Sequence, residues 1–213
     1  MKFVKLQKML WLLMTNRGLR INISLFFGMI INSLYIAGNL ASALLYRNIW
    51  SATLTVYHSL FLIIRFYLLS ARKVCQRELQ AYRVCLRVGI ILLFLDIAAT
   101  AMMVYTVQNG SLAEYSGVVL LGFLSYTVYS LTSSVLGMRR FANDNQPLHF
   151  AAKNMTLTAA LMSVFNLQYS VLLSFGAASE VIGRIIALVG FCIFFVIISL
   201  AMRLIVKNAV ALR

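Results

Sequence analysis

Long apolar segments constrain this chain more than any other feature of its sequence. The hydrocarbon core of a bilayer is about 30 Å thick, so a helix that crosses it needs roughly 20 predominantly apolar residues. Runs of that length occupy residues 21–46, 49–70, 88–107, 115–136, 155–175 and 183–206. Because hydrocarbon offers the backbone no hydrogen-bond partner, such runs are predicted to be helices. The expected fold class is all-α, a polytopic membrane protein with six transmembrane helices.

The composition agrees with that class. Hydrophobic residues make up 62% of the 213 residues, whereas soluble domains are roughly 45 to 50% apolar. The connectors at 108–111 and 143–147 carry turn-forming residues, and no connector is long enough to fold alone. We therefore expect one transmembrane domain over residues 21–206, followed by a tail at 207–213.

The basic residues predict how the chain is oriented in the membrane. Of the 19 Lys and Arg residues, all but three lie in the amino-terminal arm, the second and fourth connectors and the carboxyl-terminal tail. Only Arg47 and Arg184 lie on the other side, and Arg65 lies inside a span. Basic loops stay in the cytoplasm, so both termini are expected to be cytoplasmic in the cell membrane. The net charge of +14 is then a topology signal, and no nucleic-acid partner is expected.

The first 20 residues favour an amphipathic helix at the inner membrane surface over a frayed start of the first span. Their apolar residues share one helical face, with Lys5 and Lys8 on another. A cleavable signal peptide is not expected, because no small-residue cleavage motif follows the short apolar stretch. Lys5 and Lys8, with Arg72, Lys73 and Arg77 of the second connector, are the candidates for contact with anionic lipids. The connector charges also have the simpler interpretation of a topology signal alone.

Polar residues recur within the spans at steps of three and four, which places them on one helical face. Such stripes contain Asn32, Tyr35 and Asn39 in the first span, His58 and Arg65 in the second, and further members in the fourth and fifth spans. Each stripe has two interpretations, a packing seam between helices or a face that lines a substrate path. The intramembrane candidates are Asn32, Asn39, His58, Arg65, Asp96, Asn166 and Gln168.

Asp96 is the acidic residue expected deepest in the membrane. It lies about 12 Å along the helix from Val88, near the midplane, as does His58, whereas Arg65 lies roughly 7 Å deep. Because the second and third spans are consecutive and antiparallel, we expect Asp96 to reach Arg65 or His58. One hypothesis is a proton- or cation-responsive site. The alternative is a structural ion pair between Arg65 and Asp96.

No catalytic or metal-binding pattern is apparent in the sequence. Its three cysteines and two histidines show no spacing typical of a disulfide framework or a zinc site. Paired carboxylates, or a nucleophile beside a base, are also not recognisable. The protein is therefore not expected to be an enzyme, and no cofactor or metal is predicted.

Several short motifs lie between the second span and the end of the chain. They contain Tyr57, Arg65, Phe66, Leu69, Glu114, Tyr115, Gly117, Tyr126, Thr127, Tyr129, Leu131, Thr132, Ala151, Ala152, Lys153, Ala160, Leu161, Ser163, Leu167, Phe175 and Gly176. In these motifs the chain resembles a family of uncharacterised small six-span membrane proteins of anaerobic Firmicutes. The chain departs from that family's pattern at Gln168, where a glutamate is expected, at Asp96, where an asparagine is expected, and at His58, where an aromatic residue is expected. The resemblance implies the same six-span fold and no particular activity.

Two functions are compatible with this sequence. The polar stripes and the midplane ionisable residues favour a small transporter or channel-like protein, expected to be a homo-oligomer. The alternative is a non-catalytic accessory, assembly or regulatory protein that acts by binding another membrane protein. Short connectors and packing seams suit this alternative equally well.

Overall fold

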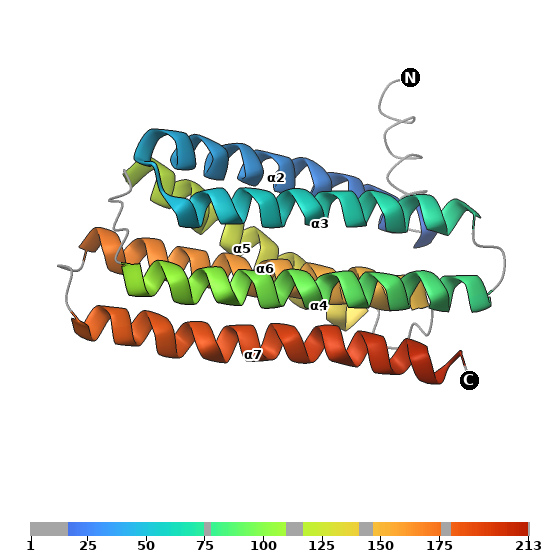
Figure 1. The fold of residues 1–213 in the computed structure, drawn as a ribbon. Helices are drawn as coiled ribbons and strands as arrows, with labels where there is room; N and C mark the ends of the chain where they lie inside the picture. Colours follow the sequence, from blue (N-terminus) through green and yellow to red (C-terminus); the bar gives the residue numbers. More distant parts are fainter. Residues whose placement is uncertain (1–16, 75–77, 110–116, 141–146, 176–179, 213) are drawn as a thin grey trace, which may run out of the picture.

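The computed structural model describes residues 17–74, 78–109, 117–140, 147–175 and 180–212. This part of the chain forms the helices α2 (Arg17–Tyr46), α3 (Ile49–Val74), α4 (Glu78–Asn109), α5 (Gly117–Arg140), α6 (Pro147–Phe175) and α7 (Glu180–Val210), shown in Figure 1. Each of these 6 helices is long and apolar enough to cross a membrane. The predicted all-α fold with six membrane-spanning segments is therefore confirmed at the level of the helices.

The helices extend beyond the predicted apolar runs. α4 begins at Glu78 rather than near Val88, and α6 begins at Pro147 rather than near Met155. Hydropathy detects only the part of a helix that suits hydrocarbon, whereas Glu, Gln and Arg continue a helix readily. Proline is also favoured in the first turn, where its missing N–H costs nothing. α2 similarly begins at Arg17, and the rest of the predicted amphipathic segment, residues 1–16, lies outside the described residues.

A two-residue connector turns the chain between α2 and α3. Arg47 has a φ of 48°, the left-handed conformation that commonly ends a helix. The Asn48 side chain then accepts a hydrogen bond from the Trp50 backbone N–H at 2.9 Å, which caps the start of α3. These two residues make α2 and α3 an antiparallel hairpin.

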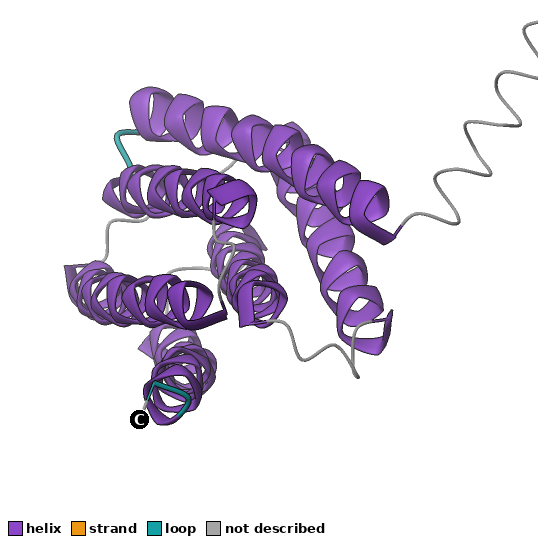
Figure 2. Cartoon of the chain, turned by 90° about the vertical axis from the view of Figure 1, so that its right-hand side faces the viewer, coloured by secondary structure: helices purple, strands orange, loops and turns teal. Residues whose placement is uncertain are grey.

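α6 is the central helix of the bundle. It contacts α3, α4, α5 and α7, whereas α2 packs mainly on α3 and more lightly on α5. In α6, 56% of the span is buried, against 28 to 33% in the other spans. Figure 2 views the bundle roughly along its helices. The start of α2 and the end of α7 lie at the same end of the bundle (Figure 1).

The largest apolar core lies between α3, α4, α6 and α7. Two glycines bring helices close together there, as small residues often do in membrane bundles. A Cβ on Gly190 would lie 2.9 Å from Phe165 Cε2, and one on Gly89 would lie 2.9 Å from Ile205 Cγ1. Outside this core, large apolar side chains such as Phe94 and Phe195 are mostly exposed, 70% and 73% respectively. Such an apolar exterior suits contact with lipid.

Candidate functional site

His58 lies at the centre of a buried group of polar side chains from three helices. Its Nδ1 lies 3.0 Å from Asn32 Oδ1, and the Asn32 side-chain amide donates to the His58 carbonyl at 3.2 Å. The Tyr126 hydroxyl donates to the same Asn32 Oδ1 at 3.1 Å. Because that oxygen can only accept, the network assigns a proton to His58 Nδ1. A neutral imidazole then leaves Nε2 as an acceptor, and this buried atom has no partner within the described residues.

Asn166 of the central helix forms a second buried group. Trp50 Nε1 donates to Asn166 Oδ1 at 3.1 Å, and Asn166 Nδ2 donates to the Tyr35 hydroxyl at 2.7 Å. Trp50, Tyr35 and Asn166 are all buried. The Oδ1 and Nδ2 atoms of the Asn166 side chain therefore connect α6 to α3 and α2.

Tyr35 connects the two groups through its ring. It stacks on Tyr126 with ring centroids 3.8 Å apart, and it meets His58 edge-on at 4.7 Å. We call the resulting cluster the polar centre. It consists of Asn32, Tyr35, Trp50, His58, Tyr126 and Asn166. The polar centre thus links α2, α3, α5 and α6, and its internal hydrogen bonds supply the partners that hydrocarbon cannot.

Asp96 lies beside the polar centre and binds Tyr57. The Tyr57 hydroxyl donates to Asp96 Oδ1 at 2.7 Å, and the Tyr57 ring lies 5.6 Å from the His58 ring. Asp96 is fully buried. Its second oxygen, Oδ2, has no hydrogen-bond partner in the part of the chain that the structure describes.

The expected contact of Asp96 with Arg65 or His58 is wrong. Asp96 directs its carboxylate at Tyr57, and no ion pair joins it to Arg65 among the described residues. Arg65 lies about 12 Å beyond Tyr57 along α3, too far for a carboxylate that is level with Tyr57. His58 is level with Tyr57, but its Nδ1 faces Asn32 on α2.

Arg65 points instead toward α2 and α5. A Cβ on Gly28 would lie 3.0 Å from Arg65 Nη1, so the guanidinium packs against this glycine of α2. Tyr126 and Tyr129 of α5 also lie near this guanidinium. The cation therefore sits between three helices, on the side of α3 away from α4.

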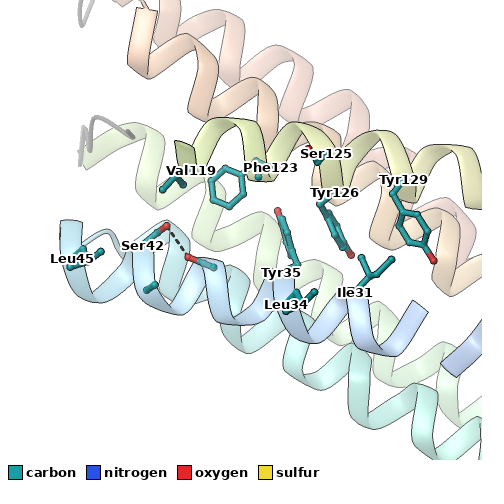
Figure 3. A pocket seen from close by; sticks show the side chains of 13 residues that line it. Ile31, Leu34, Tyr35, Ser42, Leu45, Val119, Phe123, Ser125, Tyr126 and Tyr129 are labelled. Atoms are coloured by element: carbon teal, nitrogen blue, oxygen red, sulfur yellow. Dashed lines mark hydrogen bonds between the residues drawn. The ribbon is translucent and has the colours of Figure 1, made fainter. Parts of the chain in front are cut away.

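An apolar groove separates α2 from α5 next to the polar centre. Its volume is about 480 Å³, within the usual range for ligand pockets. Tyr35 from α2 and Tyr126 from α5 project into it from opposite sides, and Tyr129 lies toward one end (Figure 3). Tyr35 and Tyr126 thus belong to both the groove and the polar centre. A molecule in the groove would touch side chains that hold four helices together.

The structure brings together some of the predicted site residues and separates others. Asn32, His58 and Asn166 all join the polar centre. Asn39 is buried, but its amide donates to the Tyr35 carbonyl of its own helix at 2.9 Å. Gln168 is only partly buried and takes no part in the polar centre. Arg72 and Lys73 lie near the end of α3, whereas Lys5, Lys8 and Arg77 lie outside the described residues.

Several important side chains were not predicted as site residues. Tyr35 and Tyr126 lie on the polar stripes, and that position was the signal for them. Tyr57 had a different signal, because it and Asp96 are nearly equally distant from the α3–α4 connector and therefore lie at one level. Trp50 had no such signal, since an indole near a helix end usually marks only the membrane interface.

The architecture and the apolar exterior define the class of this chain, a multi-pass α-helical membrane protein. Comparisons with protein-family models, with curated proteins and with solved structures found no match. The resemblance to a six-span family therefore stays a prediction.

Proposed function

We propose that this protein is a small transporter or channel-like protein rather than an enzyme. One observation supports this function most directly. His58 and Asp96 are fully buried ionisable residues on adjacent helices, and each retains one polar atom without a partner among the described residues. In a purely structural network such atoms are normally satisfied. Ionisable residues at membrane depth are most often found on ion, proton or substrate paths.

Tyr57 is the side chain that couples these two residues. Its hydroxyl holds Asp96 on α4, and its ring packs beside His58, its neighbour on α3. A proton or cation bound at Asp96 Oδ2 would neutralise a buried carboxylate and so change the strength of the Tyr57 hydrogen bond. His58 Nε2 is positioned to accept a second proton or a hydrogen bond from a substrate. We propose that binding at these atoms shifts the packing of α3 on α4.

We further propose that both termini lie in the cytoplasm of the cell and that the protein forms homo-oligomers. The basic residues of the helix ends support the orientation, because Arg17, Arg83 and Lys207 belong to the end of the bundle where α2 starts and α7 ends. Contact of this end with anionic lipid, through Lys5, Lys8, Arg72, Lys73 and Arg77, is part of the same proposal.

Flux through the purified protein tests this function. The protein would be reconstituted into liposomes containing a pH-sensitive dye, and decay of an imposed pH gradient would be recorded with Na⁺ or K⁺ as the counter-ion. We expect the wild type to dissipate the gradient. Asp96→Asn should slow the dissipation at least tenfold, because it removes the titratable carboxylate of the proposed site while preserving its shape.

Glu78→Gln is the matched control, since it makes the same chemical change at an exposed position of α4. It should retain the wild-type rate. Wild-type flux no faster than that of empty liposomes would contradict the proposal. Equal dissipation rates for the wild type and Asp96→Asn would show that Asp96 does not take part in transport.

An accessory protein that acts through a membrane partner is the second candidate. The hydrogen bonds within the polar centre favour it, because Asn32 binds His58 and Trp50 binds Asn166 across helices, as in a structural seam. This candidate predicts no intrinsic flux and a stable partner protein.

A further inference from the structure

The groove between α2 and α5 has the shape of a slot for one extended chain. On α2 it runs from Ile31 to Leu45, about 21 Å at 1.5 Å per residue. Its walls are mostly apolar, with aliphatic and aromatic side chains, and at Gly38 and Gly122 an added Cβ would meet nothing within 4 Å. The large side chains that line it, such as Leu34 and Leu45, are 67% and 76% exposed. The slot is therefore open to the lipid side of the bundle.

A cation lies just beyond one end of this slot. Gly28 lies one helical turn before Ile31 on the same face of α2, and the Arg65 guanidinium packs directly against it. Tyr129 lines the groove at this end and lies near Arg65. Among the described residues no carboxylate lies within ion-pair distance of Arg65. A cation inside a membrane span is stabilised by an anion, and this slot offers room for one that arrives with a ligand.

We propose that the α2–α5 groove binds one long-chain fatty acid. Its carboxylate would bind Arg65 in the two-pronged geometry that guanidinium groups favour. Its alkyl chain would extend past Tyr35 and Tyr126 to Leu45 and Val119 at the other end. This site goes beyond the proposed transport function and does not depend on it.

The depth of Arg65 favours a fatty acid over a phospholipid. Arg65 lies about 9 Å inside the end of the apolar part of α3 at Ala71. That level is below the head groups, where a small carboxylate is accommodated more readily than a bulky phosphodiester head. The slot, at about 480 Å³, is also small for a lipid with two acyl chains. The shape and the single cation therefore match one chain with one small anionic end.

Direct binding tests this inference. The protein would be placed in nanodiscs of phosphatidylcholine, and tritiated palmitate binding would be measured by scintillation proximity. We expect saturable binding of one palmitate per chain. Hexadecanol, which has the same chain without the charge, should compete at least tenfold more weakly, a difference of about 1.4 kcal/mol. Absence of saturable palmitate binding, or equal competition by hexadecanol, would overturn the proposal.

Two variants locate the site. Gly122→Leu fills the groove at a position with open space, and Arg65→Gln removes the cation, so each should weaken palmitate binding at least tenfold. Gly137→Leu is the matched control, because Gly137 also lies on α5 in open space but does not line the groove. It should bind like the wild type. Unchanged binding by Gly122→Leu would place the palmitate elsewhere and contradict the proposal.

Other occupants of the groove would be recognised in the same experiment. Nanodiscs that contain phosphatidylglycerol should not reduce palmitate binding. If they abolish it, a phospholipid is the occupant. If Gly38→Cys on α2 forms a disulfide-linked dimer, a second copy covers the groove. Either result would contradict the proposal that a fatty acid occupies the groove. If the wild type binds palmitate but shows no flux in the liposome assay, only the transport function is contradicted.

Discussion

Asn166 shows how single residues hold this bundle together. Its carbonyl accepts from Trp50 on α3 and its amide donates to Tyr35 on α2, and all three side chains are buried. In hydrocarbon neither the Trp50 indole nor the Tyr35 hydroxyl can form a hydrogen bond with water instead. A single amide on the central helix therefore fixes the rotation of two neighbouring helices.

Asn166→Ala tests the strength of this arrangement. The substitution removes the partner of a buried indole N–H and of a buried hydroxyl, so we expect a loss of about 1 to 3 kcal/mol in the free energy of unfolding. Gln168→Ala, a nearby change outside the polar centre, should cost less than about 0.5 kcal/mol. Titration with a denaturing detergent measures both. Equal unfolding midpoints for the two variants would show that the Asn166 bonds contribute no net stability.

At the residue scale, the sequence predicted which polar side chains are important better than how they pair. Asn32, His58 and Asn166 were recognisable because a polar residue within an apolar run must face the bundle interior. Their partners depend on the rotation and level of each helix, which hydropathy does not contain. Asp96 illustrates this limit, since it was predicted to reach Arg65 or His58 and instead binds Tyr57.

At the scale of the helices, the existence of each apolar span was predictable and its ends were not. The start of α4 at Glu78 lies ten residues before the predicted start, because helix propensity continues where hydropathy ends. The groove between α2 and α5 was also not predictable. It arises because α2 packs mainly on α3, and no spacing along either sequence indicates how far apart α2 and α5 lie.

The helix ends allow the proposed orientation to be tested. Arg47, between α2 and α3, and Ala211, after α7, are both exposed and belong to opposite ends of the bundle. In a variant without native cysteines, Arg47→Cys should react with a membrane-impermeant maleimide added to intact cells, whereas Ala211→Cys should react only after permeabilisation. Labelling of Ala211→Cys in intact cells would place the carboxyl terminus outside and contradict the charge argument.

At the scale of the whole molecule, the polar centre and the groove form one connected region around Tyr35 and Tyr126. A ligand in the groove would contact Tyr126 and Tyr35, whose hydrogen bonds reach Asn32 on α2 and Asn166 on α6. Occupancy of the groove is therefore expected to change the relative positions of four helices.

The central claim is that this chain acts by itself in the membrane, and the native mass of the extracted protein tests it most directly. The protein would be extracted from its membrane into a mild detergent and its native mass spectrum recorded. We expect copies of this chain alone, each retaining a mass that matches a long-chain fatty acid. A stoichiometric second protein that survives extraction would contradict the claim and make this chain an accessory of that partner.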